Sequence, residues 1–423
     1  MATRKAEDYL PKEYDKPEED HVFNIRGRIF QGHTYAADRE SSLFQILDVG
    51  DNFLQVFREY YQIENSIVLP DVKLFLIESP DVNAFAVYEE CLNSYCIGIF
   101  GGVCEQLESN VRTSFERVSG ILFPEEEAEE WYAHLFVQAI RFFVIHEYAH
   151  ILCGHVTKGS TGAHFEFADG ERTEDDNLIQ QMKEFQADQM AMAYLCSMAY
   201  LDTQSQHNYR VLRYDEMEQQ FWEEKFPDVP EFIRRLYLGD KRTAFVEESQ
   251  QKRVGYIHKR LKAIMGGINV VFHTLDSNRK RMTRYWVERN SITQEEQESF
   301  LFRSGLSTMR QFDHPLPCLR LESVFRMMDE SIEAFEPGLV VPQLEREVAD
   351  FAWMVEVYRN EFRVDELYCH IPHTPTAQDF IQEMEALWQE KKHTFPAVVP
   401  PLVRLFYANR IVDMNDNGEL ILP

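Results

Sequence analysis

The chain contains two histidines and a glutamate at a spacing that suits metal chemistry. His146 and His150 are four residues apart, and Glu147 directly follows the first histidine. Residues four apart lie on one face of a helix, so the two imidazoles can bind one ion while Glu147 projects toward a water molecule beside it. The alternative is a pair of core histidines next to a charged residue. A catalytic zinc site has three protein ligands, so a third must come from elsewhere in the chain.

Two patterns for the third ligand give different results. One class of zinc peptidases places a glycine and a histidine three and six residues after the second histidine, but Cys153 and Val156 occupy these positions. Another class uses a carboxylate on a following helix, which Glu184 supplies. Asp188 lies four residues after Glu184, on the same helical face, where it would accept the ring N–H of a ligand histidine. The pattern therefore predicts one zinc ion, with Glu184 as the third ligand and Asp188 behind it.

Other groups near this pattern leave alternatives open. Glu184 and Asp188 would also fit a solvated pair of carboxylates, although the helix that follows Glu184 is otherwise apolar. The acidic residues 174–176 are a rival source of a carboxylate, but a flexible loop fixes metal geometry poorly. His155 lies off the predicted metal face and is interpreted as a helix cap or a pocket residue, and Cys153 as a buried thiol.

Apolar periodicity indicates the elements that must position these residues. Residues 131–152 are an apolar, aromatic run that predicts a long buried helix, with acidic residues before it and Gly154 as its stop. A second apolar helix is predicted over residues 177–201, after a polar loop, and another near residues 42–61. Three strands separated by turn residues are predicted at residues 72–77, 83–88 and 95–100.

The composition restricts the partners and the compartment. The formal net charge is −28 and the sequence pI is near 4.9, so no nucleic-acid partner is expected, because phosphate binding requires clustered Lys and Arg. No apolar segment follows the charged N-terminus as in a secretory signal, and no run approaches the roughly 18 apolar residues of a membrane span. The seven cysteines lack paired spacing and are interpreted as reduced thiols. These features predict a cytoplasmic protein and leave its oligomeric state open.

Four segments, in this order along the chain, resemble a known family of metallopeptidases. They are residues 79–86 (SPDVNAFA), 146–150 (HEYAH) with Gly154-His155, 184–188 (EFQAD) and 314–320 (HPLPCLR). Together they look like the gluzincins of the CAAX-prenyl-protease and heat-shock-protease family. That family is usually embedded in membranes. Soluble bacterial relatives with similar motifs, among them peptidases of the phage-exclusion type and repressor-cleaving peptidases of mobile elements, are a better match to this chain.

The resemblance implies a role for each matching position of the metal site. His146, His150 and Glu184 would bind zinc, and Asp188 would be hydrogen-bonded behind a ligand. Glu147 would act as the general base and later as the proton shuttle. A zinc ion would lower the pKa of its water toward about 7 and polarise the peptide carbonyl.

Two further segments acquire roles only through the resemblance. His314 or Arg320 would stabilise the oxyanion if their segment folds over the site; the alternative is a structural helix entry and an ion pair with a carboxylate. A free strand edge would pair with an extended substrate, or would be an ordinary half-buried strand. That edge is predicted at Asn83, Ala84, Phe85 and Ala86.

These inferences combine into an expected fold and domain organisation. The fold class is predicted as α+β and mainly helical, with a zincin-like domain that joins a small sheet, a zinc-binding helix and a glutamate helix. Helix breaks are predicted at residues 227–230, 276–278, 315–317 and 337–338. The predicted divisions are a mobile tail at residues 1–20, a zincin-like catalytic core at 21–210, a helical region that completes the cleft at 211–335 and a C-terminal helical region at 336–423.

Two classes of function remain open. The leading hypothesis is a zinc-dependent metalloendopeptidase that hydrolyses a restricted intracellular protein or peptide substrate, because an open protease in the cytoplasm would endanger its host. The alternative is a non-catalytic or conditionally activated zincin-fold protein with a role in regulation or defence. The intact Glu147 argues against the non-catalytic form, since a purely structural site does not need a general base.

Overall fold

The structure is a computed structural model of the whole chain. It describes residues 19–25, 28–35, 42–65, 68–122, 128–158, 164–165, 174–225, 227 and 231–289, with a few positions between 320 and 421. Within these residues the fold is mainly helical with a small mixed sheet, in agreement with the predicted α+β class. Several predictions fall outside the described residues: nearly all of the tail, the breaks at 315–317 and 337–338, His314 and almost all of the C-terminal region.

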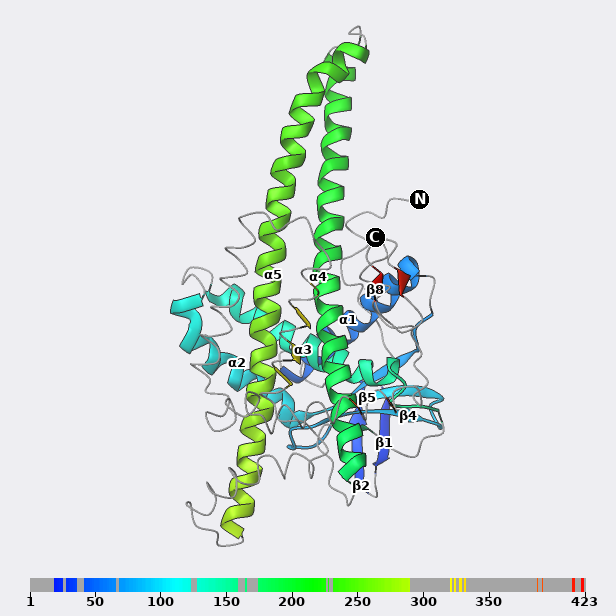
Figure 1. Cartoon of the computed structure of the whole chain (residues 1–423), viewed down its shortest axis with the longest axis vertical. Helices are drawn as coiled ribbons and strands as arrows, with labels where there is room; N and C mark the ends of the chain where they lie inside the picture. Colours follow the sequence, from blue (N-terminus) through cyan, green and yellow to red (C-terminus); the bar gives the residue numbers. More distant parts are fainter. Residues whose placement is uncertain are drawn as a thin grey trace.

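A six-stranded mixed sheet forms one part of the protein (Figure 1). The strands lie in the order β1 (Asp20–Ile25), β2 (Arg28–His33), β3 (Val72–Ile77), β5 (Ser94–Phe100), β4 (Ala84–Glu89) and β6 (His164–Phe165). β3 and β5 are parallel, and every other pair of neighbours is antiparallel. The central strands β3, β4 and β5 are rich in the apolar β-branched and aromatic residues that favour a buried sheet.

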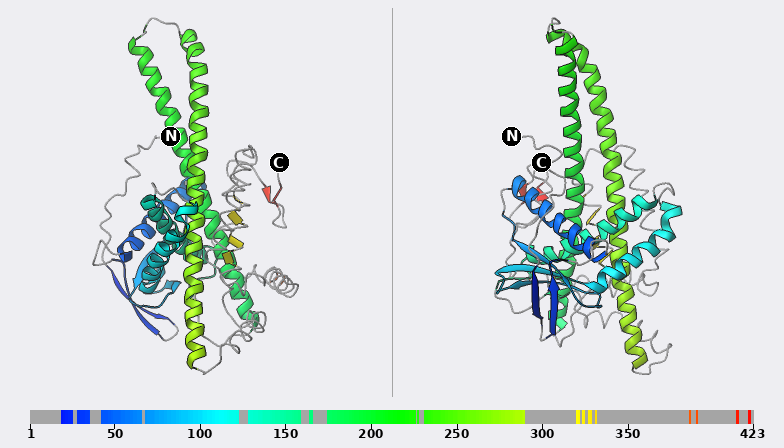
Figure 2. Two further views of the ribbon diagram at one scale, coloured as in Figure 1. Left: turned by 90° about the vertical axis from the view of Figure 1, so that its left-hand side faces the viewer. Right: turned by 180° about the vertical axis from the view of Figure 1, so that it is seen from behind.

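The sheet curls so that β1 packs over strands that are not its neighbours. The ring centroid of Phe23 on β1 lies 5.1 Å from that of Phe75 on β3 and 5.2 Å from that of Phe85 on β4. Figures 1 and 2 show β1 and β2 standing across the direction of β4 and β5. One face of the sheet is therefore covered by its own first strand.

The opposite face of the sheet is covered by helices. The helices α1 (Ser42–Asn65) and α3 (Ala128–Leu152) contact strands β3 and β4, and α2 (Gly101–Leu122) follows directly after β5. Gly50 of α1 lies so close to the sheet that an added Cβ would be 2.7 Å from Leu74 of β3 and 3.0 Å from Val144 of α3. The central helix α3 contacts α1, α2, α4 and α5 as well as the sheet, which explains its almost uniformly apolar sequence.

Two long helices form a hairpin that crosses this body. The helices α4 (Glu174–Lys225) and α5 (Glu231–Arg289) pack against α3 along part of their length and then extend together away from the sheet (Figure 1). Where α5 crosses α3, an added Cβ on Gly267 would lie 2.7 Å from the Ala139 backbone nitrogen. The glycine therefore permits the close approach of the two helices. In the distant part of the hairpin, the rings of Tyr214 and Phe245 stack with centroids 4.2 Å apart.

Most predicted elements are present, although several ends differ. The strand at residues 72–77 agrees with the prediction, and the other two predicted strands correspond to β4 and β5, with ends that differ by one residue. The predicted break at 227–230 falls between α4 and α5. The break predicted at 276–278 is wrong, because α5 continues through Asp, Ser and Asn, whose cost in a helix is small compared with that of proline. The strands β1 and β2 and the helix α2 were not predicted.

The hydropathy of α3 was also underestimated. Among the described residues, one segment, Trp131–Leu152, is long and apolar enough to cross a membrane by length and composition alone, and 89% of the tested window is buried inside the protein. A buried core helix of a soluble protein passes the same test, so this segment is weak evidence for a membrane span.

Candidate metal centre

Three side chains from two helices converge inside the protein. His146 and His150 lie on consecutive turns of α3, and Glu184 lies on α4 where that helix packs against α3. Their exposed fractions are 2%, 0% and 0%, respectively. Because the second half of α3 is buried on every side, its polar residues are enclosed by the same packing that holds the helix in place. The three predicted ligands are thus brought together, although they are distant in sequence.

The spacing of their ligand atoms suits a single ion. His146 Nε2 is 3.1 Å from His150 Nε2 and 3.3 Å from Glu184 Oε2, and His150 Nε2 is 3.6 Å from Glu184 Oε1. Bonds of about 2.0–2.2 Å to a tetrahedral zinc ion place neighbouring ligand atoms about 3.3 Å apart. Two imidazole nitrogens and one carboxylate are also a ligand set that catalytic zinc takes. These residues could therefore hold a metal ion, and the donor set fits zinc.

The buried charges provide a second test of this fit. Glu147, Glu184 and Asp188 are buried carboxylates with exposed fractions of 1%, 0% and 0%. Arg320 is buried beside two of them. Carboxylates that lie close together in a buried region repel one another, and their burial is costly unless positive charge is near them. A divalent cation bound by these side chains would offset part of that cost.

Asp188 holds one of the predicted ligands from behind. Its Oδ1 lies 2.9 Å from His146 Nδ1, the ring nitrogen that faces away from the predicted ion. A carboxylate this close to Nδ1 favours the tautomer that has its proton on Nδ1, which leaves a lone pair on Nε2 for a metal. The prediction that Asp188 lies behind a ligand histidine agrees with this geometry.

Arg320 holds Asp188 in turn. The guanidinium donates hydrogen bonds from Nε to Asp188 Oδ2 at 2.7 Å and from its Nη2 to Asp188 Oδ1 at 2.9 Å. The same Nη2 lies 3.4 Å from Glu184 Oε2, and the guanidinium carbon lies 5.3 Å from the centroid of the Phe272 ring. Of the two roles considered for Arg320, the structure shows the ion pair with a carboxylate, because two of its donors bind Asp188. Its role as an oxyanion stabiliser is not supported by these contacts.

The end of α3 positions a residue that the sequence analysis placed off the metal face. Gly154 has φ 75°, a conformation that favours glycine, and its N–H donates to the Ile151 carbonyl. The His155 N–H donates to the His150 carbonyl at 2.9 Å, so the two bonds form a Schellman cap. The cap folds the chain back, and His155 Nδ1 lies 2.9 Å from His150 Nδ1. His155, interpreted from the sequence as a helix cap or a pocket residue, is therefore part of the cap and contacts His150 directly.

The contacts of His155 define which ring nitrogens carry protons. His155 Nε2 lies 2.9 Å from Gln186 Oε1, and an amide oxygen can only accept, so His155 Nε2 carries the hydrogen. Burial, followed by the positive charge of Lys183, lowers the pKa of His155 to about 3, so the ring is neutral and its Nδ1 accepts. His150 Nδ1 then donates to His155, and His150 Nε2 has a lone pair that could bind a metal. The hydrogen bonds from His150 to His155 and from His155 to Gln186 thus orient the His150 ring, as Asp188 orients the His146 ring.

The remaining residues considered at this site have other positions. The Cys153 Sγ lies 3.0 Å from the Met190 Sδ. Burial raises the pKa of the Cys153 thiol to about 12, so this side chain is a protonated, buried thiol. His314 lies outside the described residues. The acidic residues 174–176 form the first turn of α4.

The predicted free strand edge requires a correction. Residues 84–86 are part of β4, but Phe85 pairs with Phe165 and Ala86 with His164 of β6. Asn83 precedes the strand and its carbonyl accepts the Phe100 N–H at 3.1 Å. The edge of β4 is therefore already occupied at Phe85 and Ala86. The two-residue strand β6 lies in a polar, glycine-containing segment that gave no strand pattern.

No family model, curated protein or solved structure matches the chain. The assignment of the centre therefore depends on its residues and their geometry.

Proposed function

We propose that the protein is a zinc-dependent metalloendopeptidase. The observation that carries this proposal is the buried group of His146, His150 and Glu184, whose ligand atoms lie at the spacing of a single metal ion. Glu147 directly follows the first ligand on the same helix and is buried with it. This arrangement is that of the zincin peptidases, in which the glutamate after the first histidine is the general base.

The proposed chemistry requires a base beside the metal ligands. A zinc ion at this centre would supply Lewis-acid chemistry, lowering the pKa of a water molecule to about 7 and polarising a peptide carbonyl. The Glu147 carboxylate would take a proton from the attacking water and give it to the nitrogen of the leaving amine. Asp188 and His155 would hold the ligand imidazoles in the tautomers that leave each Nε2 lone pair available.

The burial of the centre favours a conditionally activated form of the same enzyme as a second candidate. Both ligand histidines, Glu184 and Glu147 have exposed fractions of 2% or less, so a protein substrate would reach them only after part of the surrounding structure moves. A closed centre of this kind would limit hydrolysis to a restricted intracellular substrate. If the centre stays closed in solution, a small chelator such as pyridine-2,6-dicarboxylate would reach bound zinc slowly and remove it over hours. Removal within seconds would contradict the closed form.

A comparison in cells tests the proposed activity and does not require an identified substrate. Cells that produce the wild-type protein are compared with cells that produce Glu147→Gln, and new protein N-termini are identified by mass spectrometry. The proposal predicts at least one cleavage that requires Glu147. Glu105→Gln, at an exposed position of α2, is the matched control and should cleave as the wild type does. If the conditions that activate defence and stress responses produce no Glu147-dependent cleavage, the peptidase proposal is wrong.

A further inference from the structure

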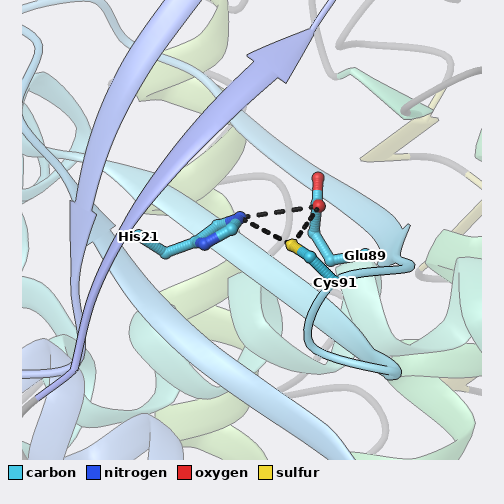
Figure 3. Close-up of side chains that lie close together, drawn as sticks. All are labelled: His21, Glu89 and Cys91. Carbon is cyan, nitrogen blue, oxygen red and sulfur yellow. Dashed lines mark hydrogen bonds and ion pairs between the residues drawn. The ribbon is translucent and has the colours of Figure 1, made fainter.

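A second group of potential metal ligands lies on the sheet. His21 Nε2 is 3.5 Å from Glu89 Oε2 and 3.9 Å from Cys91 Sγ, and Cys91 Sγ is 3.5 Å from the same Glu89 oxygen. Figure 3 shows the three side chains pointing toward one another from β1, from the end of β4 and from the turn after it. His21 and Glu89 are half-buried, whereas Cys91 is exposed.

This group is separate from the buried centre because it lies on the other face of the sheet. Phe85 and Glu89 are four residues apart on β4, so their side chains leave the same face, and Phe85 contacts Phe23 of β1 on that face. The helix that carries His146 and His150 contacts the opposite face. The two groups of ligands therefore do not compete for one ion.

Each of the three side chains is held in place by the local structure. The His21 ring packs edge-to-face on Phe23 with centroids 4.5 Å apart, and its centroid lies 6.1 Å from that of Phe75. Glu89 pairs with Ser94 in the last register of the β4–β5 hairpin. The turn that contains Cys91 ends at Asn93, which has φ 47° and accepts hydrogen bonds from the Tyr88 hydroxyl at 2.7 Å and from Lys158 at 3.2 Å. These contacts hold the strands and the turn from which the three side chains extend.

We propose that His21, Glu89 and Cys91 form a second site for a thiophilic divalent cation, zinc in the first instance. A tetrahedral zinc ion places nitrogen, oxygen and sulfur ligands about 3.3–3.6 Å apart, close to the three observed separations. Thiolate and imidazole select zinc over magnesium and calcium, which prefer oxygen ligands. A thiolate and a carboxylate also neutralise the two positive charges of the ion.

The position of the site indicates what the ion would do. His21 and Cys91 are 70 residues apart in sequence, and they belong to β1 and to the β4–β5 turn, which are not neighbours in the sheet. A shared ion would therefore tie the strand that covers this face to the hairpin beneath it. Its effect would be on stability, and it does not depend on the proposed peptidase activity.

Cobalt binding distinguishes this site from the buried centre. The full-length protein, purified with a phosphine reductant, is titrated with Co²⁺. A thiolate ligand produces a near-ultraviolet charge-transfer band that a centre of two histidines and a glutamate does not produce. The proposal predicts a band that saturates at about one cobalt per thiolate site and that zinc abolishes by displacing the cobalt. The band should be lost in Cys91→Ser and in His21→Asn.

Two controls determine whether the band belongs to this site. His150→Ala, which disrupts the buried centre, should retain the band, and so should His33→Asn, which changes a histidine that lies between two carboxylates on the neighbouring strand. Zinc should also raise the melting temperature of His150→Ala protein but not that of the His150→Ala/Cys91→Ser double variant. Absence of the band in folded wild-type protein, or its persistence in folded Cys91→Ser, would overturn the proposal. If Cys91→Ser does not fold, Cys91→Ala provides the same test at this exposed position.

Discussion

The buried centre and the group of His21, Glu89 and Cys91 on the sheet each bring three potential metal ligands together, but their surroundings differ. In the buried centre, Asp188 and His155 hold the second nitrogen of each ligand histidine, and Glu147 stands next to a ligand. On the sheet, a partly exposed thiol replaces the second histidine, and aromatic packing fixes the one imidazole. Thiolate-containing sites are typical of structural zinc, whereas two histidines, a carboxylate and an adjacent base are typical of catalytic zinc. The residues around the ligands therefore suggest different uses for similar ions.

Replacing Glu147 by Gln gives the largest expected effect. The amide cannot accept a proton, so peptide hydrolysis should fall by about 10²–10⁴-fold, the usual contribution of a general base. The zinc content should stay the same, because Glu147 is not a ligand. Hydrolysis of an identified substrate is measured together with zinc by mass spectrometry. An unchanged rate of peptide hydrolysis would show that Glu147 is not the general base. The buried centre would then have no catalytic feature that distinguishes it from the group on the sheet.

Replacing Arg320 by Gln should affect stability most strongly. The change leaves the buried Asp188 and Glu184 carboxylates without their guanidinium, and breaking a buried ion pair from one side costs about 3–5 kcal/mol. The free energy of unfolding is measured in urea with zinc present. Arg242→Gln removes a similar pair with Asp215 on the exposed hairpin and should cost less than about 1 kcal/mol. Equal losses in both variants would contradict the account of the buried centre.

Replacing Asp188 by Asn should weaken zinc binding by about 10–100-fold. The amide is a poorer acceptor for the His146 Nδ1–H, so the imidazole is less basic and less firmly oriented. Zinc affinity is measured by competition with a chromophoric chelator. Asp215→Asn, at a half-buried position of α4 away from the buried centre, is the control and should bind zinc as the wild type does. An affinity within about twofold of the wild type would show that the partner behind the ligand is unimportant.

His33 on the sheet should make the free energy of unfolding depend weakly on pH. Burial lowers the pKa of His33, but hydrogen bonds to Asp20 and Glu78 outweigh this and leave the pKa above 6.5. The stability that these hydrogen bonds to protonated His33 contribute is therefore fully present below pH 6.5. It is lost as the pH rises through the higher pKa of His33 in the folded state. The two carboxylates are exposed, so the loss should not exceed about 1 kcal/mol.

Urea unfolding between pH 6 and pH 9 measures this contribution. The wild type should lose stability relative to His33→Asn as the pH rises. If the wild type instead gains stability relative to His33→Asn as the pH rises, the assignment of the raised pKa to His33 is wrong.

The sequence predicted the parts of the fold whose patterns are local. The apolar run of α3, the strand at residues 72–77 and the stop at Gly154 follow from periodicity and from the conformational preference of glycine. The grouping of Glu184 with the two histidines could be predicted from the sequence because a catalytic zinc site requires a third protein ligand. Glycine followed at once by histidine also signals the cap that turns His155 back toward His150.

Other features depend on tertiary contacts that no local pattern reveals. The strand β6 has two residues, and its pairing to β4 closes the edge that the sequence left free. The helix predicted over residues 177–201 continues without a break into the helical region predicted from residue 211, and the resulting α4 forms one arm of a long hairpin with α5. The motif left an oxyanion role and an ion pair open for Arg320, and its contact with the buried Asp188 depends on tertiary structure. The group on the sheet arises only because the sheet curls and brings β1 over β4.

The zinc content of the Cys91→Ser protein tests the central claim most directly, because this variant disrupts the other group of potential metal ligands found among the described residues. X-ray absorption at the zinc edge shows which atoms surround the zinc ion. We expect about one zinc per chain, bound by two imidazoles and oxygen at about 2.0–2.2 Å without sulfur, and we expect it to be lost in Cys91→Ser/Glu184→Gln. Absence of zinc, a sulfur ligand, or full retention of zinc in the double variant would contradict the assignment of His146, His150 and Glu184 as the metal centre.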